Sequence, residues 1–159
     1  MVLTSEASAA SRTRTRETSV TTPAPERFEL PIRVMPDDID VLGHVNNVVY
    51  LRWVQDIAVA HWQAAATPEQ QETLIWVVVR HEIDYKHPAM AGDEVLARTW
   101  VGVASRRTFE RHTEISRADG RLLARARTLW CPLDPATYRP ATVSADVRAR
   151  FSVPASQNG

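Results

Sequence analysis

The stretch from Asp40 to Trp53 reads DVLGHVNNVVYLRW and joins a polar turn to the start of an apolar, periodic segment. Asn46 and Asn47 stand where the pattern changes. A short side-chain oxygen at such a position accepts hydrogen bonds from amides of the first helical turn. The sequence therefore predicts a helix that begins at Asn46 or Asn47, with an acid, a glycine and a histidine placed directly before it.

Beyond this turn, apolar side chains recur at spacings of three and four as far as about Ala66. Such a wide apolar arc indicates a helix that is enclosed on most sides. The arc contains Val49, Tyr50, Trp53, Val54, Ile57, Ala60, His61, Trp62 and either Ala64 or Ala65, and the polar stripe contains Arg52, Gln55, Asp56 and Gln63.

The segments on either side of this helix are typical of strands. Before it, FELPIRVM predicts a first strand from Phe28, and Pro31 favours an edge position or a bulge. After a turn around Thr67–Glu69, four strand-like runs follow with connections too short to cross over to parallel strands. They are LIWVVVRHEIDYKHP, GDEVLARTWVGVA, SRRTFERHTEISR and RLLARARTLWCPLD, before SADVRARF, which predicts a short final helix opened by Ser144.

This order predicts an α+β fold, in which a curved antiparallel sheet of five to six strands wraps around one long central helix. The 159 residues, of which 44% are hydrophobic, fit a single folded domain, expected over residues 27–152. Residues 1–26 and 153–159 are expected to be disordered tails. Arg12, Arg14 and Arg16 leave an organelle transit peptide as the alternative for the first tail.

Composition excludes several classes of partner. Lys+Arg and Asp+Glu both number 19, so no net field favours nucleic acid or an anionic membrane. The single cysteine, Cys131, excludes an intrachain disulfide framework and a thiolate metal cluster. No apolar run reaches the length that spans a bilayer, so we expect a cytoplasmic protein.

The same residues, in the same order, resemble the hotdog-fold thioesterases of the 4-hydroxybenzoyl-CoA and long-chain acyl-CoA type. The pattern DxxGHVNNxxYLxW is followed by VVVxxxxxYKHPAxxGDEV, SRRTFERHTEI and YRPxxVSADVRARF, over about residues 28–151. The resemblance implies hydrolysis of acyl-CoA or acyl carrier protein thioesters to a free acid and a thiol, without a metal or another cofactor. It also implies a homodimer or homotetramer whose sheets join edge to edge, with the acyl groove at the subunit boundary.

Asp40 matches the catalytic aspartate of this family, three residues before Gly43. As a general base or as a nucleophile, a carboxylate suits thioester hydrolysis, and both routes remain open. A helix start presents free amides and partial positive charge, which polarise a thioester carbonyl placed there. Asp37 and Asp38, in the same loop, are interpreted as solvated residues or turn formers.

The resemblance also implies substrate contacts around the helix start and at a distant turn. The expected contacts are His44, Val45, Asn46, Asn47 and Tyr50, with Arg106 and Arg107 on the nucleotide of coenzyme A. Apart from Val45, each has an alternative role: the asparagines would cap the helix, the histidine would hold the loop closed, Tyr50 would lie in the core, and the arginines would be solvated. His81 and Glu82 lack the spacing of a helical zinc motif, so no metal site is predicted.

Two other functions compete with hydrolysis. A non-catalytic module that binds acyl thioesters has the same fold, but the retention of Asp40 with GHVNN weighs against it. A hotdog dehydratase or hydratase usually pairs a histidine with an acid, an arrangement that the Asp40 loop lacks.

Overall fold

The computed structural model describes residues 26–151, so the two predicted tails lie outside this range apart from Glu26. Five strands form one sheet in the order β1-β3-β4-β5-β2, and every pair is antiparallel. The strands are β1 (Phe28–Arg33), β2 (Ile75–Tyr85), β3 (Glu94–Ala104), β4 (Phe109–Arg117) and β5 (Leu122–Leu133). The helices are η1 (Pro36–Asp38), α1 (Asn47–Ala65), α2 (Pro68–Thr73) and α3 (Ala145–Arg150).

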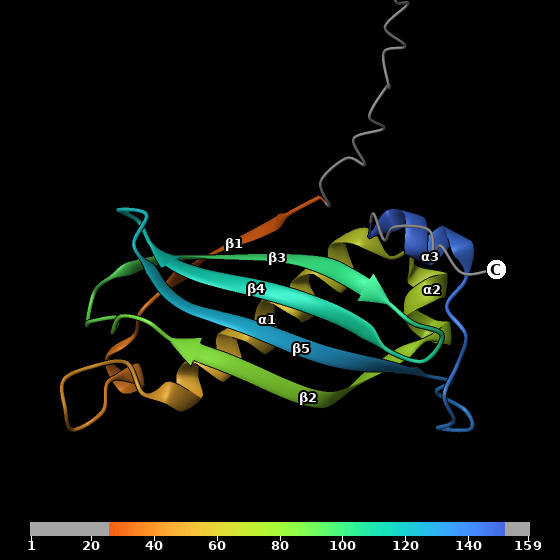
Figure 1. The fold of residues 1–159 in the computed structure, drawn as a ribbon, viewed down its shortest axis with the longest axis horizontal. Coiled ribbons are helices and arrows are strands. Elements are labelled where there is room, and N and C mark those ends of the chain that lie inside the picture. The colour runs from red at the N-terminus through yellow and green to blue at the C-terminus, as the bar shows by residue number, and fades with distance from the viewer. Residues whose placement is uncertain (1–25, 152–159) are drawn as a thin grey trace, which may run out of the picture.

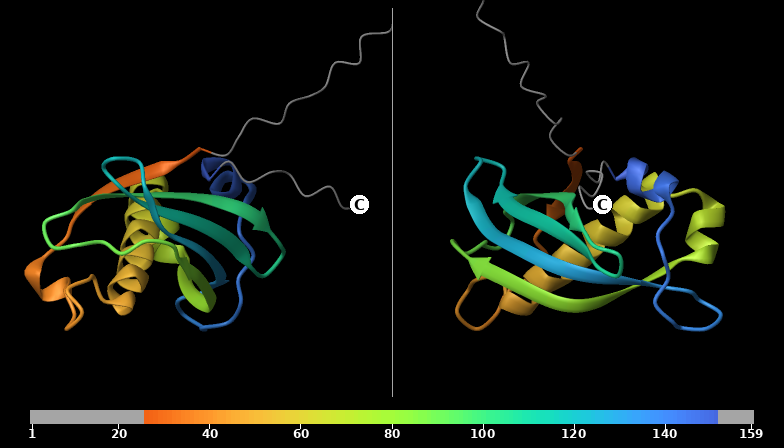
Figure 2. Two further views of the ribbon diagram at one scale, coloured as in Figure 1. Left: turned by 60° about the vertical axis from the view of Figure 1, so that its left-hand side comes forward. Right: turned by 45° about the vertical axis from the view of Figure 1, so that its right-hand side comes forward.

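The sheet curves around α1, which crosses its concave face (Figures 1 and 2). The predicted α+β architecture with one long central helix is therefore confirmed, with five strands. Pro31 lies in β1 at one edge of the sheet, as expected for a residue that has no amide hydrogen to donate. β2 forms the opposite edge.

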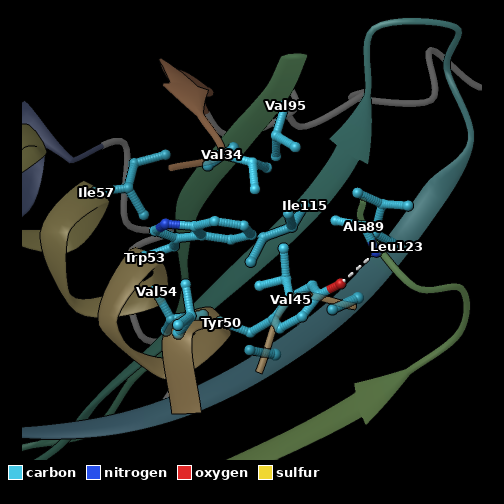
Figure 3. Packing of buried hydrophobic residues seen from close by; sticks show 14 residues of the cluster. Val34, Val45, Tyr50, Trp53, Val54, Ile57, Ala89, Val95, Ile115 and Leu123 are labelled. Carbon is cyan, nitrogen blue, oxygen red and sulfur yellow. Dashed lines mark hydrogen bonds between the residues drawn. The ribbon is translucent and has the colours of Figure 1, made fainter. Parts of the chain in front are cut away.

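Burial of one face of α1 against the sheet forms the main core. Tyr50, Trp53, Val54 and Ile57 are each at most 2% exposed, and they pack against inward side chains of the strands (Figure 3). The hydroxyl of Tyr50 accepts a hydrogen bond of 2.8 Å from the amide of Ala89. Because this buried polar group is paired, the ring is accommodated in the core without an unsatisfied oxygen.

The opposite face of α1 is less enclosed than the apolar arc predicts. Val48 is 69% exposed and Val59 is 43% exposed, so the exposed face contains apolar residues beside the predicted polar stripe. Apart from Ala64, every residue of the predicted arc is buried or half-buried, so the arc is confirmed, and the exposed face of the single chain is wider than the predicted polar stripe. Within residues 26–151, no helix is both long and apolar enough to cross a membrane.

The sequence interpretation missed α2 and placed only a turn there. Thr67 Oγ1 accepts a hydrogen bond from the amide of Gln70, and Gln70 Oε1 accepts one from the amide of Thr67. Pro68 occupies the first helical turn. A threonine followed three residues later by glutamine, with proline directly after the cap, is the signal that would have predicted this helix.

His61 lies on the buried face of α1 and accepts a hydrogen bond of 3.0 Å at Nδ1 from Arg111 Nη1. Burial, with the nearby charge of Arg111, lowers the pKa of His61 from 6.5 to about 4. Between these two values the unfolded chain therefore binds a proton that the folded chain does not.

We predict that the free energy of unfolding falls by up to about 3 kcal/mol as the pH drops from 6.5 to 4. The stability that the neutral ring of His61 provides is fully present above pH 6.5 and is lost as the pH falls toward 4. Urea unfolding at a series of pH values measures it. His61→Gln keeps a side-chain acceptor and should flatten this part of the curve, whereas the exposed His87→Gln should not. Equal pH dependence in all three proteins would contradict the assignment.

Candidate functional site

The loop before α1 closes on itself by backbone hydrogen bonds. Ile39 pairs with Val45 in an isolated antiparallel bridge, and the amide of Asp40 donates to the carbonyl of His44 over 2.8 Å. Gly43 has a φ of 79°, a conformation that side chains disfavour and glycine adopts readily. The loop therefore returns the chain so that Asp40 lies next to the start of the helix.

Asp40 keeps part of its carboxylate available. Its Oδ1 accepts a hydrogen bond of 2.8 Å from the amide of Leu42, and Oδ2 has no hydrogen-bond partner within residues 26–151. The side chain is partly exposed. One oxygen thus fixes the orientation of the group while the other can meet water or a ligand.

At the start of α1, the amide hydrogen of Asn47 has no partner among the described residues. Asn46 Oδ1 accepts from the amide of Val48 over 3.0 Å, and the carbonyl of Asn46 accepts from Val49 over 2.9 Å. In the described part of the chain, the amide of Asn47 donates to no acceptor. Asn46 is therefore the cap, and the amide of Asn47 is a donor at the positive end of the helix.

The structure brings some of the expected substrate contacts to this surface and buries others. Asn46 and Asn47 are exposed and His44 is partly exposed. The carbonyl of His44, rather than its ring, takes part in closing the loop. Val45 and Tyr50 are core residues at 3% and 2% exposure, and contact between their side chains and a substrate stays a prediction.

Asp38 is not the solvated residue that the sequence suggested. It is 3% exposed, and its carboxylate accepts hydrogen bonds from Arg52 Nη2 over 2.6 Å and from the amide of Met35 over 2.9 Å. Burial raises the pKa of Asp38, but the bonds from Met35 and Arg52 outweigh it and leave the pKa below its ordinary value. Its carbonyl accepts from the amide of Asn46, so Asp38 joins the loop to the helix.

Tyr85, at the end of β2, is a site residue that the sequence interpretation missed. Its hydroxyl donates to the carbonyl of Asn47 over 3.0 Å, and its ring lies edge-on to that of Tyr50. This contact ties the start of α1 to an edge strand of the sheet. The alternation of side chains along β2 predicts that Tyr85 faces the helix, but it does not predict the hydrogen bond to the carbonyl of Asn47.

Arg106 and Arg107 lie far from this loop within one chain. They occupy the turn between β3 and β4, whereas the Asp40 loop lies near the beginning of β3, at the opposite end of the sheet (Figure 1). The eleven residues of β3 span about 33 Å. A single chain therefore does not bring the two arginines to Asp40.

No three His, Cys, Asp or Glu side chains among the described residues lie close enough together to hold a metal ion. His81 Nδ1 instead lies 2.9 Å from Thr128 Oγ1.

Comparison with known families decides the classification. The profile described as "Thioesterase-like superfamily" matches residues 34–151, which include the Asp40 loop, α1 and all strands except β1. The chain belongs to the thioesterase-like superfamily. The family prediction from the sequence is therefore confirmed.

Individual members of the superfamily are similar in sequence or structure. A chloroplastic palmitoyl-acyl carrier protein thioesterase from Gossypium hirsutum is 30% identical in an alignment of 108 residues, which covers 62% of this chain but only 26% of that protein. A thioesterase from Thermus thermophilus, solved with coenzyme A and zinc, is 26% identical with a TM-score of 0.69, over 77% of this chain and 90% of that one.

A 1,4-dihydroxy-2-naphthoyl-CoA thioesterase from Synechocystis has the same fold, with 22% identity, a TM-score of 0.69, and coverage of 79% of this chain and 96% of the other.

Proposed function

We propose that the protein hydrolyses acyl thioesters, with Asp40 as the reacting carboxylate. The observation that carries this proposal is the pairing of a partly free carboxylate with the unpartnered amide of Asn47 at the start of α1, both within the described part of the chain. Thioester hydrolysis needs a group that activates or replaces the nucleophile and a donor for the oxygen that becomes negative. Membership of the thioesterase-like superfamily supports the same reaction.

In the proposed reaction, the thioester carbonyl oxygen accepts a hydrogen bond from the amide of Asn47, and the helix terminus stabilises its developing charge. Asp40 then either removes a proton from water as water attacks the carbonyl carbon, or attacks that carbon itself. In the second route water hydrolyses the resulting anhydride. Both routes break the carbon–sulfur bond and release an acid and a thiol.

Asp40→Asn keeps an oxygen for the amide of Leu42 but removes the negative charge, so the fold should persist while turnover falls by roughly 10² to 10⁴-fold. The test follows thiol release from a panel of acyl-CoA and acyl carrier protein esters with a thiol-trapping dye. Asp37→Asn, in the neighbouring helix η1 and exposed, is the matched control and should retain activity. Full activity in Asp40→Asn would overturn the mechanism.

We further propose that the protein is a homodimer joined through β2. This edge strand has eleven residues without proline, and Val77 and Val79 on it are 40% and 59% exposed. A long edge strand without proline favours pairing with another strand despite its irregularity between Val78 and Arg80, whereas β1 is shorter and contains Pro31. The exposed Val48 and Val59 of α1 offer further apolar surface for a partner.

A two-fold axis through the middle of β2 would place the Tyr85 end of one strand beside the Ile75 end of the other. The turn with Arg106 and Arg107 lies at the Ile75 end of its own sheet. In the dimer that turn would approach the start of α1 in the partner. Two guanidinium groups there suit the phosphates of coenzyme A.

Val79→Lys should convert the dimer to a monomer, because it places a charge on the edge that pairs, and it should reduce turnover with it. Val103→Lys, at a residue that is 73% exposed on β3, adds the same charge away from this edge and should leave the dimer intact. Size-exclusion chromatography with light scattering measures both. A wild type that is monomeric at assay concentrations would contradict the proposed dimer.

A further inference from the structure

A cavity of about 330 Å³ lies between the second half of α1 and the sheet, away from the Asp40 loop. Its walls are largely apolar, and the exposed residues Gln55, Val59 and Gln63 of α1 border it. The aromatic residues that line it are Trp62, Trp76, Phe109, Trp130 and Phe151. Its size and apolar walls are those of a small-molecule site.

One charged side chain lines this cavity. Arg111, on β4, is 8% exposed, and its Nη1 donates to His61 Nδ1 over 3.0 Å and to Thr99 Oγ1 over 3.2 Å. Nε and Nη2 have no acceptor within residues 26–151, and neither atom is fully enclosed by protein. Part of the guanidinium group is therefore available to a molecule in the cavity.

The charge of Arg111 has no counter-ion in the part of the chain that the structure describes. No carboxylate of those residues lies within 4.0 Å of it, and the lowered pKa of His61 keeps that ring neutral at neutral pH. Burial lowers the pKa of Arg111 to about 10, so it remains protonated there. A buried unpaired cation is unfavourable, and an anionic oxygen is the group that would compensate it.

Two of the tryptophans that line the cavity also have a polar atom that is unpaired within the described part of the chain and is buried rather than exposed to the cavity. The indole nitrogens of Trp76 and Trp130 are buried and, among the described residues, have no hydrogen-bond partner. Gln55, Gln63 and Gln71 supply amide groups that can donate or accept, so Arg111 is the one fixed charge among the described residues that line the cavity. A hydrocarbon chain alone would match the aromatic surface but would leave the guanidinium group unpaired.

We propose that this cavity binds the end of the acyl group that is remote from the thioester, and that Arg111 selects acyl groups ending in a carboxylate. This inference rests on the proposed thioesterase function and on the dimer through β2. Trp76 lies at the beginning of β2, and Tyr85 at its end contacts Asn47. Two-fold pairing of the β2 edges would therefore set the α1 start of one subunit opposite the cavity of the other.

The direct test compares CoA esters of equal chain length that end in a methyl group or in a carboxylate, such as hexanoyl-CoA with adipyl-CoA and octanoyl-CoA with suberyl-CoA. Wild-type kcat/KM should be higher for the carboxylate ester in at least one pair. Arg111→Met should reduce this ratio by about 10- to 100-fold, as expected for loss of a hydrogen bond between charged groups. Arg111→Lys keeps the charge and should retain part of the preference.

Arg125→Met is the matched control, because this arginine is exposed on β5 and does not line the cavity. It should leave the ratio unchanged. A second readout needs no turnover: free suberate should change the tryptophan fluorescence of the wild type saturably, since three tryptophans line the cavity, and should not do so in Arg111→Met.

The outcomes separate this inference from the proposed function. Hydrolysis that prefers methyl-ended esters in every pair, with no effect of suberate on fluorescence, would overturn the cavity assignment and leave the thioesterase function standing. Absence of hydrolysis for every ester, with saturable suberate binding that depends on Arg111, would support the carboxylate site and overturn the proposed reaction.

Discussion

The start of α1 is held by hydrogen bonds from three different segments, and the proposed chemistry depends on that constraint. The carbonyl of Asp38 accepts from Asn46, the carbonyl of Ala89 accepts from Val45, and the hydroxyl of Tyr85 donates to Asn47. These bonds fix the helix terminus relative to the Asp40 loop before any substrate arrives. A donor and a carboxylate that are already in place need little reorganisation during the reaction, which is how electrostatic stabilisation becomes effective.

A second constraint is the length of the sheet. The Asp40 loop lies at one end, while the cavity with Arg111 and the turn with Arg106 and Arg107 lie toward the other. In one chain these parts are separated along the strands. The free edge of β2 and the exposed apolar residues of α1 give a physical reason for a second copy to pair there, and two-fold symmetry would bring the separated parts together.

Features encoded by local sequence could be predicted, and features that depend on distant partners could not. The cap at Asn46, the length of α1 and the five strands follow from spacing and turn residues. The capping box that begins α2 is equally local and was overlooked. By contrast, the burial of Asp38 depends on Arg52, which lies 14 residues further on, and the bond from Tyr85 depends on the return of β2. Arg111 lies between these cases: its inward position follows from the alternation of β4, but its contact with His61 emerges only from the fold.

A mixed dimer tests most directly whether each active site is shared between two subunits, which is the central claim. Subunits carrying Asp40→Asn are combined with subunits carrying Arg111→Met, and hydrolysis of suberyl-CoA is measured. If the site is shared, one of the two sites in each mixed dimer contains both native residues, and activity should rise well above that of either parent dimer. Activity no greater than the average of the two parents would show that Asp40 and Arg111 do not act in the same site across the interface.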